Sequence, residues 1–409
     1  MSSLPPSSSD SPKPSATRSS DAAVTPGGSA RGPSGDWVAA AEPLSWRKNA
    51  WLFVATAVCV FLKGAQQTDA AFLSHASLVS GAQFAGALLS ILLAHEFGHY
   101  IAARLHKVDA SLPFFIPMPF LSPFGTMGAV IRMRGVIPTR KALLDIGASG
   151  PLAGICLAIP LYAWGVAHSR LIPWDGTSGG LELGESVLSK VIDHFAVGHV
   201  PDGMNIELSP IAFAAWAGMF VTMINLFPVG QLDGGHVAYA LLGKRQDRAA
   251  VIAHRAMLAF FFVSIGGYLV RDARAGLGFH RIGEHVNNSM FWLVWFEVLA
   301  VLGTLSSRKR EAPASPETLS VGTRVAATAL LVALAAFGRD YSSVGLWIAW
   351  FVGLGVLLAM EVRGGTLRSH ATFEHPSAGT SPLGVLRVGI AVVTLLLFAL
   401  LFMPTPISM

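Results

Sequence analysis

Long apolar runs separated by short polar segments dominate this chain. An α-helix needs about 20 apolar residues to cross a bilayer, or somewhat fewer where the bilayer thins. The runs that reach or approach this length lie at residues 49–62, 84–104, 143–168, 210–228, 251–270, 290–305, 323–338, 344–362 and 385–404. This pattern predicts an all-α polytopic membrane protein with about nine transmembrane helices.

Two further apolar segments, 112–131 and 229–242, are broken by proline and glycine. Irregular backbone survives at membrane depth only where protein buries it or where it lines a wet cavity. We therefore expect both segments to be embedded in the membrane without crossing it. Within the first of them, small and apolar residues alternate over 125–131, as in a short β-hairpin edge.

The polar parts of the chain suggest an organisation into four regions. Residues 1–45 are rich in Ser, Pro and Gly and predict a disordered tail. A polar linker at 306–322, expected in the cytoplasm, would separate a catalytic core at 46–305 from accessory C-terminal transmembrane helices at 323–409. The accessory region carries no cluster of metal-type ligands.

Charge supports this topology. Only 13% of the residues are charged, about half the share of a soluble domain. If the N-terminus is cytoplasmic, the main basic clusters fall on the cytoplasmic side, as the positive-inside rule requires, although Arg271 and Arg274 do not. These clusters lie near residues 47–48, 104–141, 244–248, 308–310 and 363–368. The net charge of +5 therefore indicates a lipid bilayer as the partner and argues against nucleic acid, because no basic stripe with interleaved aromatic residues is present.

The second apolar run contains the motif His-Glu-x-x-His at His95, Glu96 and His99. Residues four apart share one face of a helix, so both imidazoles can reach one metal. Neutral imidazole suits Zn²⁺, and in this motif the glutamate is the general base of a metalloprotease. Placing ionisable side chains in a lipid-immersed helix costs free energy. This favours a functional role over a structural one in which the side chains only pair with one another or with backbone groups. We therefore predict one Zn²⁺ per chain, held by His95 and His99, with Glu96 as the catalytic base.

A catalytic zinc site needs a third protein ligand. The segment from Asn225 to His236 is broken by Pro228 and several glycines, and it places Asp233 in an apolar setting where a carboxylate should be paired or metal-bound. Asp233 is the preferred third ligand, and His236 is its rival. Asn225 could hydrogen-bond the substrate backbone or the developing oxyanion, or it could simply cap the broken helix.

These two motifs resemble those of the site-2 protease family of intramembrane metalloproteases, which pair His-Glu-x-x-His with Asn-x-x-Pro-x-x-x-Leu-Asp-Gly. The resemblance covers roughly residues 84–245 and implies that His95, His99 and Asp233 bind zinc and that Glu96 is catalytic. It also implies that the hairpin-like segment near the active site, including Gly128 and Ala129, binds an unwound substrate by strand pairing. The alternative is that this segment is a membrane-embedded plug without substrate contact. The loop at 169–209 is too short for an inserted PDZ domain, so the branch without one is expected.

The resemblance implies an endopeptidase that cuts a membrane-anchored protein in or near its transmembrane segment. Two other classes remain open. A catalytically silent membrane scaffold would not need Glu96, and a solute transporter would distribute its ligands along a path instead of gathering them in two motifs.

Overall fold

A computed structural model provides the coordinates of the chain. It describes residues 29–31, 37–39, 46–68, 70–120, 122–134, 137–173, 182–308, 320–339, 343–363, 378–379 and 381–408. The chain divides into two units, Met1–Ser45 and Trp46–Met409. The tail predicted to be disordered lies outside the described residues, apart from the strands β1 (Ser29–Arg31) and β2 (Trp37–Ala39), which pair antiparallel. Most of the predicted 306–322 linker also lies outside them.

The second unit is mostly helical, and each predicted apolar run contains a helix. The helices are α1 (Trp46–Ala65), α2 (His75–Leu105), α3 (Arg140–Ala167), α4 (Val187–Ala196), α5 (Pro210–Asn225), α6 (Asp233–Leu242), α7 (Arg245–Arg274), α8 (Ile282–Arg308), α9 (Val321–Gly338), α10 (Val344–Arg363) and α11 (Val385–Leu401). Seven of the described helices are long and apolar enough to cross a membrane, whereas α5 and α11, with 16 and 17 residues, are shorter. The chain is an integral membrane protein, but the expected count of nine spans is not established.

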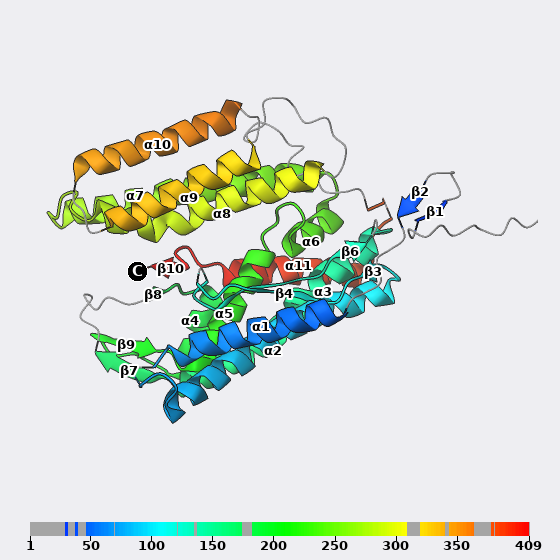
Figure 1. The fold of residues 1–409 in the computed structure, drawn as a ribbon, viewed down its shortest axis with the longest axis horizontal. Helices are drawn as coiled ribbons and strands as arrows, with labels where there is room; N and C mark the ends of the chain where they lie inside the picture. Colours follow the sequence, from blue (N-terminus) through cyan, green and yellow to red (C-terminus); the bar gives the residue numbers. More distant parts are fainter. Residues whose placement is uncertain are drawn as a thin grey trace, which may run out of the picture. The chain divides into compact units, whose positions relative to one another are not determined.

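Helices α2, α3 and α5 form the centre of the core (Figure 1). Helix α1 packs on α2, and α6 packs on α3. Small residues allow the close approach of α2 and α3: a Cβ at Gly98 would lie 2.5 Å from the carbonyl oxygen of Ser149. Helix α2 begins nine residues before the apolar run because Ser74 caps it and because Ser77 and Ser80 donate hydrogen bonds to carbonyls at the end of α1.

Helices α7, α8, α9 and α10 share a second hydrophobic cluster (Figure 1). Three buried charged side chains connect the last three of these helices. Arg324 of α9 donates a hydrogen bond of 2.9 Å to Glu361 of α10, and its Nε lies 3.9 Å from Glu297 of α8. We call Glu297, Arg324 and Glu361 the three-charge cluster.

The helices after residue 320 pack in two different places. While α9 and α10 join α7 and α8, the last helix α11 packs against α3, α5 and α6. Arg387 of α11 forms a two-pronged ion pair with Asp145 of α3, and Asp145 also contacts His106 at the end of α2. The C-terminal helix is therefore part of the packing around the core.

Short antiparallel strand pairs complete the fold. The strand β4 (Phe114–Pro117) pairs with β5 (Thr126–Val130), which confirms a small β-hairpin inside the segment 112–131. The remaining pairs are β3 (Asp109–Ala110) with β6 (Met133–Arg134), β7 (Arg170–Pro173) with β9 (Met204–Glu207), and β8 (Glu182–Leu183) with β10 (Ile407–Ser408).

Candidate metal centre and active site

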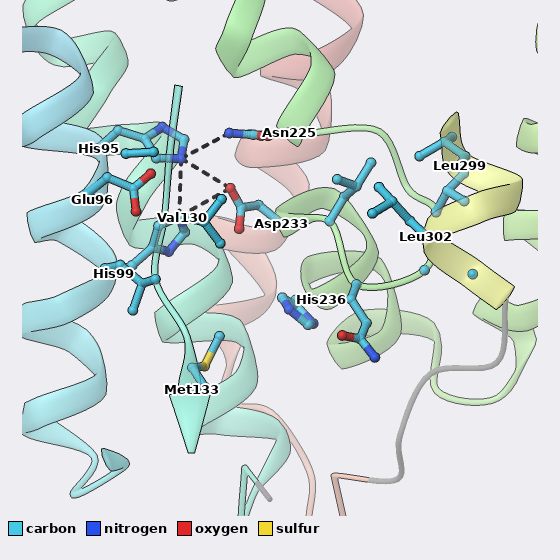
Figure 2. A pocket seen from close by; sticks show the side chains of 17 residues that line it. His95, Glu96, His99, Val130, Met133, Asn225, Asp233, His236, Leu299 and Leu302 are labelled. Carbon is cyan, nitrogen blue, oxygen red and sulfur yellow. Dashed lines mark hydrogen bonds and ion pairs between the residues drawn. The ribbon is translucent and has the colours of Figure 1, made fainter. Parts of the chain in front are cut away.

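Two imidazoles and one carboxylate meet between α2 and α6 (Figure 2). His95 and His99 project from adjacent turns of α2, and Asp233 is the first residue of α6. The Nε2 atoms of the two histidines are 3.2 Å apart, and each lies 3.2 Å from Oδ2 of Asp233. Both histidines are buried. Two potential ligand atoms from α2 and a third from Asp233, 134 residues after His99, thus form a nearly equilateral triangle.

The dimensions of this triangle fit zinc. Tetrahedral zinc with nitrogen and oxygen ligands at about 2.0–2.1 Å requires ligand atoms about 3.3–3.4 Å apart. Three protein ligands are also the number found in catalytic zinc sites, where the fourth position is left for water or substrate. The residues present are therefore compatible with one mononuclear zinc ion.

The protonation of His99 fits a metal ligand as well. Its Nδ1 lies 2.7 Å from the carbonyl oxygen of Ile146, which can only accept a hydrogen bond, so Nδ1 carries the proton. A neutral imidazole then presents a lone pair on Nε2, facing the lone pairs of His95 and Asp233. This convergence is stable only with a cation or a proton at its centre, and the carbonyl is a typical second partner of a metal-binding histidine.

Glycines of α3 make room for these imidazoles. A Cβ at Gly150 would lie within 2.5 Å of three ring atoms of His99, and one at Gly154 would lie 3.3 Å from Cβ of His95. Small residues on this face of α3 allow close helix packing. The same face lies directly against the two candidate ligands.

Glu96 and Asn225 lie beside the metal group. Glu96 is 4% exposed, and its side chain is placed between the two imidazoles (Figure 2). Nδ2 of Asn225, the last residue of α5, lies 3.3 Å from Nε2 of His95. The site therefore holds a candidate base and a candidate hydrogen-bond donor, both in contact with the same small volume.

His236 lies one helical turn after Asp233. It borders the same cavity, but among the described residues the group of converging ligand atoms contains only His95, His99 and Asp233. Figure 2 shows its ring on the far side of Asp233 from both imidazoles. Its position favours Asp233 over His236 as the third ligand.

A cavity of about 330 Å³ opens from the metal group. One wall is the hairpin strand β5, with Ala129 and Val130, and in the described part of the chain β5 pairs only with β4. Gly128, which was predicted to contact substrate with Ala129, is not among the described residues that line the cavity; it has a positive φ of 97°, and its N–H donates to Oγ1 of Thr126.

The other walls come from two further elements. The loop between α5 and α6 contributes Val229 to Leu232, and α8 contributes Leu299, Leu302 and Gly303. The α8 residues were missed in the sequence, because an apolar run gives no sign of which of its residues face a cavity and which face lipid. The fold and the site together define a polytopic membrane protein with an embedded mononuclear metal centre.

Comparison with known proteins agrees with this class. Residues 83–264 match the family model described as Peptidase family M50, and the chain therefore carries a domain of that family. The matched segment contains the metal group, Glu96 and Asn225. It ends before α8 begins.

Curated relatives are similar over the same region. The chain is 31% identical over 207 residues to the "Probable zinc metalloprotease EGY2, chloroplastic" of Arabidopsis thaliana. The aligned region covers 47% of this chain and 36% of that protein. The chain is 34% identical over 166 residues to the "Probable zinc metalloprotease EGY1, chloroplastic" of the same plant, covering 38% and 29%. A third relative, the "Probable zinc metalloprotease EGY3, chloroplastic" of Oryza sativa subsp. indica, is 26% identical over 300 residues, covering 66% and 44%.

The chain thus spans about a third of the length of the first two relatives. No solved structure matches it. The similarity to zinc metalloproteases and the His-His-Asp group both identify zinc as the metal of this class of site.

Proposed function

We propose that this chain is an intramembrane zinc metalloendopeptidase that hydrolyses a peptide bond in or near a transmembrane segment of a membrane-anchored protein. The observation that carries the proposal is the group formed by the buried His95 and His99 and the partly buried Asp233, with the buried Glu96 beside it, inside a polytopic membrane fold. In this proposal His95, His99 and Asp233 hold one zinc ion.

Zinc, when bound, polarises the scissile carbonyl and lowers the pKa of water to near neutrality. Glu96 is the general base: its carboxylate takes a proton from the attacking water and delivers it to the leaving amine. Asn225 donates an N–H from Nδ2 toward the carbonyl oxygen as negative charge develops there. Burial of Glu96 excludes bulk water from its carboxylate and so strengthens its interactions.

The hairpin provides a place for an extended substrate. A helical peptide bond is shielded, so the substrate must unwind before attack. The edge of β5 that faces the cavity could hold the unwound segment by main-chain hydrogen bonds, with Ala129 beside the scissile region and Gly128 contributing backbone groups to the strand. The distribution of basic residues supports an N-terminus in the cytoplasm, with the metal site below the cytoplasmic surface.

A catalytically silent scaffold is the second candidate, because the same fold and metal could exist without hydrolysis. The two differ in what Glu96 does. In the scaffold Glu96 is dispensable, and in the peptidase it carries the proton transfer.

The test compares Glu96→Gln with the wild-type protein and with Glu207→Gln, which changes an exposed carboxylate on β9. Each purified protein is incubated in liposomes with a tagged single-span membrane protein, and the fragments and bound zinc are measured. We expect Glu96→Gln to keep its zinc and to cut at least about 100-fold more slowly, since general base catalysis contributes roughly 10²–10⁴-fold. Cleavage by Glu96→Gln at the wild-type rate would refute the peptidase mechanism.

A further inference from the structure

One wall of the active-site cavity lies outside the M50 domain. Leu299, Leu302 and Gly303 of α8 line the cavity, whereas the family match ends at residue 264 and α8 begins at Ile282. Figure 2 shows Leu299 and Leu302 on a helix across the cavity from His95 and His99. A substrate segment lying along β5 would therefore have the metal group on one side and α8 on the other.

Contacts on the opposite face of α8 hold this wall in position. Successive residues of an α-helix are about 100° apart, so Glu297 is about 160° from Leu299 and about 140° from Leu302 around the helix axis. One face of α8 thus borders the cavity, and the opposite face joins the three-charge cluster. The side chains of Glu297, Arg324 and Glu361 are all at most 3% exposed. Separating α8 from α9 would expose buried charges to lipid or leave them without their partners, which is costly.

The chemistry of the cavity wall favours apolar side chains. Its lining away from the metal group is largely apolar, with Val130, Val229 and Leu232 opposite or beside the two leucines of α8. No lysine or arginine is among the described residues that line it. The nearest negative groups are Glu96, the proposed general base, and Asp233, a proposed zinc ligand, so neither is left to pair with a charged substrate side chain.

The two leucines differ in exposure. Leu299 is 3% exposed and is packed in the second hydrophobic cluster, whereas Leu302 is 47% exposed. Leu302 lines the cavity at an exposed position, so its truncation changes the cavity without creating a void in the packed interior. Substitution of Leu302 therefore tests the role of α8 without disturbing the packed interior.

We propose that α8 is the specificity wall of this peptidase: Leu302, backed by Leu299 and fixed by the three-charge cluster, limits the substrate side chain next to the scissile bond to small and medium apolar residues. This inference rests on the proposed function. Leu302 is a specificity-determining residue, and the three-charge cluster positions it.

The experiment uses the full chain with zinc in liposomes. The cleavage site in a tagged single-span membrane protein is first mapped by mass spectrometry. Each residue flanking that bond is then varied to Ala, Leu and Phe, and kcat/KM is measured for every substrate. We expect the wild-type protein to cut the Ala and Leu substrates and to disfavour Phe.

Two opposite variants then test the wall. Leu302→Ala should raise kcat/KM for the Phe substrate relative to the Ala substrate by about tenfold, and Leu302→Phe should lower the Leu-to-Ala ratio by about tenfold, the size of effect seen for small changes in hydrophobic pockets. Leu305→Ala is the matched control, because Leu305 is 44% exposed on the same helix but is not among the described residues that line the cavity. The control should leave the ratios unchanged.

The outcomes separate the two proposals. If the Leu302 variants keep the wild-type ratios, or slow all substrates equally, α8 is not a specificity wall, and the peptidase assignment stands. If the zinc-loaded wild-type protein cuts no substrate faster than Glu96→Gln does, the proposed function itself fails.

Discussion

Gly150 offers a direct test of how the metal centre is built. A Cβ at this position would lie within 2.5 Å of three atoms of the His99 ring, whereas ordinary carbon contacts are about 3.5–4.0 Å. The ring would therefore have to retreat by about 1 Å. It is also held by the 2.7 Å hydrogen bond from Nδ1 to Ile146, so it cannot retreat without weakening that bond. Gly150→Ala should then displace Nε2 from the triangle that it forms with His95 and Asp233.

We expect Gly150→Ala to weaken zinc binding by at least 10- to 100-fold, the effect typical of losing a partner that orients a ligand. Zinc content is measured by mass spectrometry after equilibration with graded concentrations of a competing chelator. Gly86→Ala is the control, because it makes the same change in α2 at a position with no neighbouring atom within 4 Å of the added Cβ. If Gly150→Ala folds and binds zinc as tightly as Gly86→Ala, the placement of Gly150 against His99 is wrong.

Two further predictions concern stability. Burial raises the pKa of Asp193, in the extramembrane helix α4, to about 6 from an ordinary value of 3.8. The folded state therefore holds a proton that the unfolded state releases, and the stability contributed by this group should be present below about pH 4 and lost as the pH rises through 6. Asp193→Asn should flatten thermal denaturation temperatures across this window, and an unchanged pH dependence would contradict the assignment. Separately, Arg324→Met leaves the two carboxylates of the three-charge cluster buried without their cation. It should lower the free energy of unfolding by about 3–5 kcal/mol in a detergent titration, and a loss below about 1 kcal/mol would show that the cluster is not a clamp.

Much of the candidate centre could be predicted because polar residues in apolar runs are conspicuous. The spacing of His95 and His99 alone placed both imidazoles on one helix face, and the glycine-broken backbone around Asp233 marked a carboxylate that needed a partner. The residues that orient the group could not be predicted. The carbonyl of Ile146 carries no sequence signal, and the contact of Gly150 with His99 depends on how α3 packs on α2.

Helix lengths departed from hydropathy where local chemistry overrides it. The apolar run at 210–228 continues past the end of α5, but the helix ends at Asn225 because Pro228 disfavours helical backbone just before it. Likewise α11 ends at Leu401, ahead of Pro404, although its run continues. Hydropathy detects apolar composition and not hydrogen bonding, so both segments were predicted as full-length spans.

The wall formed by α8 shows a different limit of sequence reasoning. In a membrane helix the lipid-facing side is as apolar as the side facing a cavity. Leu302 and Leu305 are therefore equivalent in the sequence, and only packing distinguishes them. Among these residues of α8, Glu297 is the one that the sequence could have singled out, because a carboxylate in a transmembrane helix needs a partner. The other two residues of the cluster, on α9 and α10, stand at no sequence spacing that a motif would reveal. The carboxylate therefore indicates that α8 packs against a charged partner, but not that this packing positions the cavity wall. The structure adds the missing relation, because it puts the charged face of α8 directly behind the face that borders the metal centre.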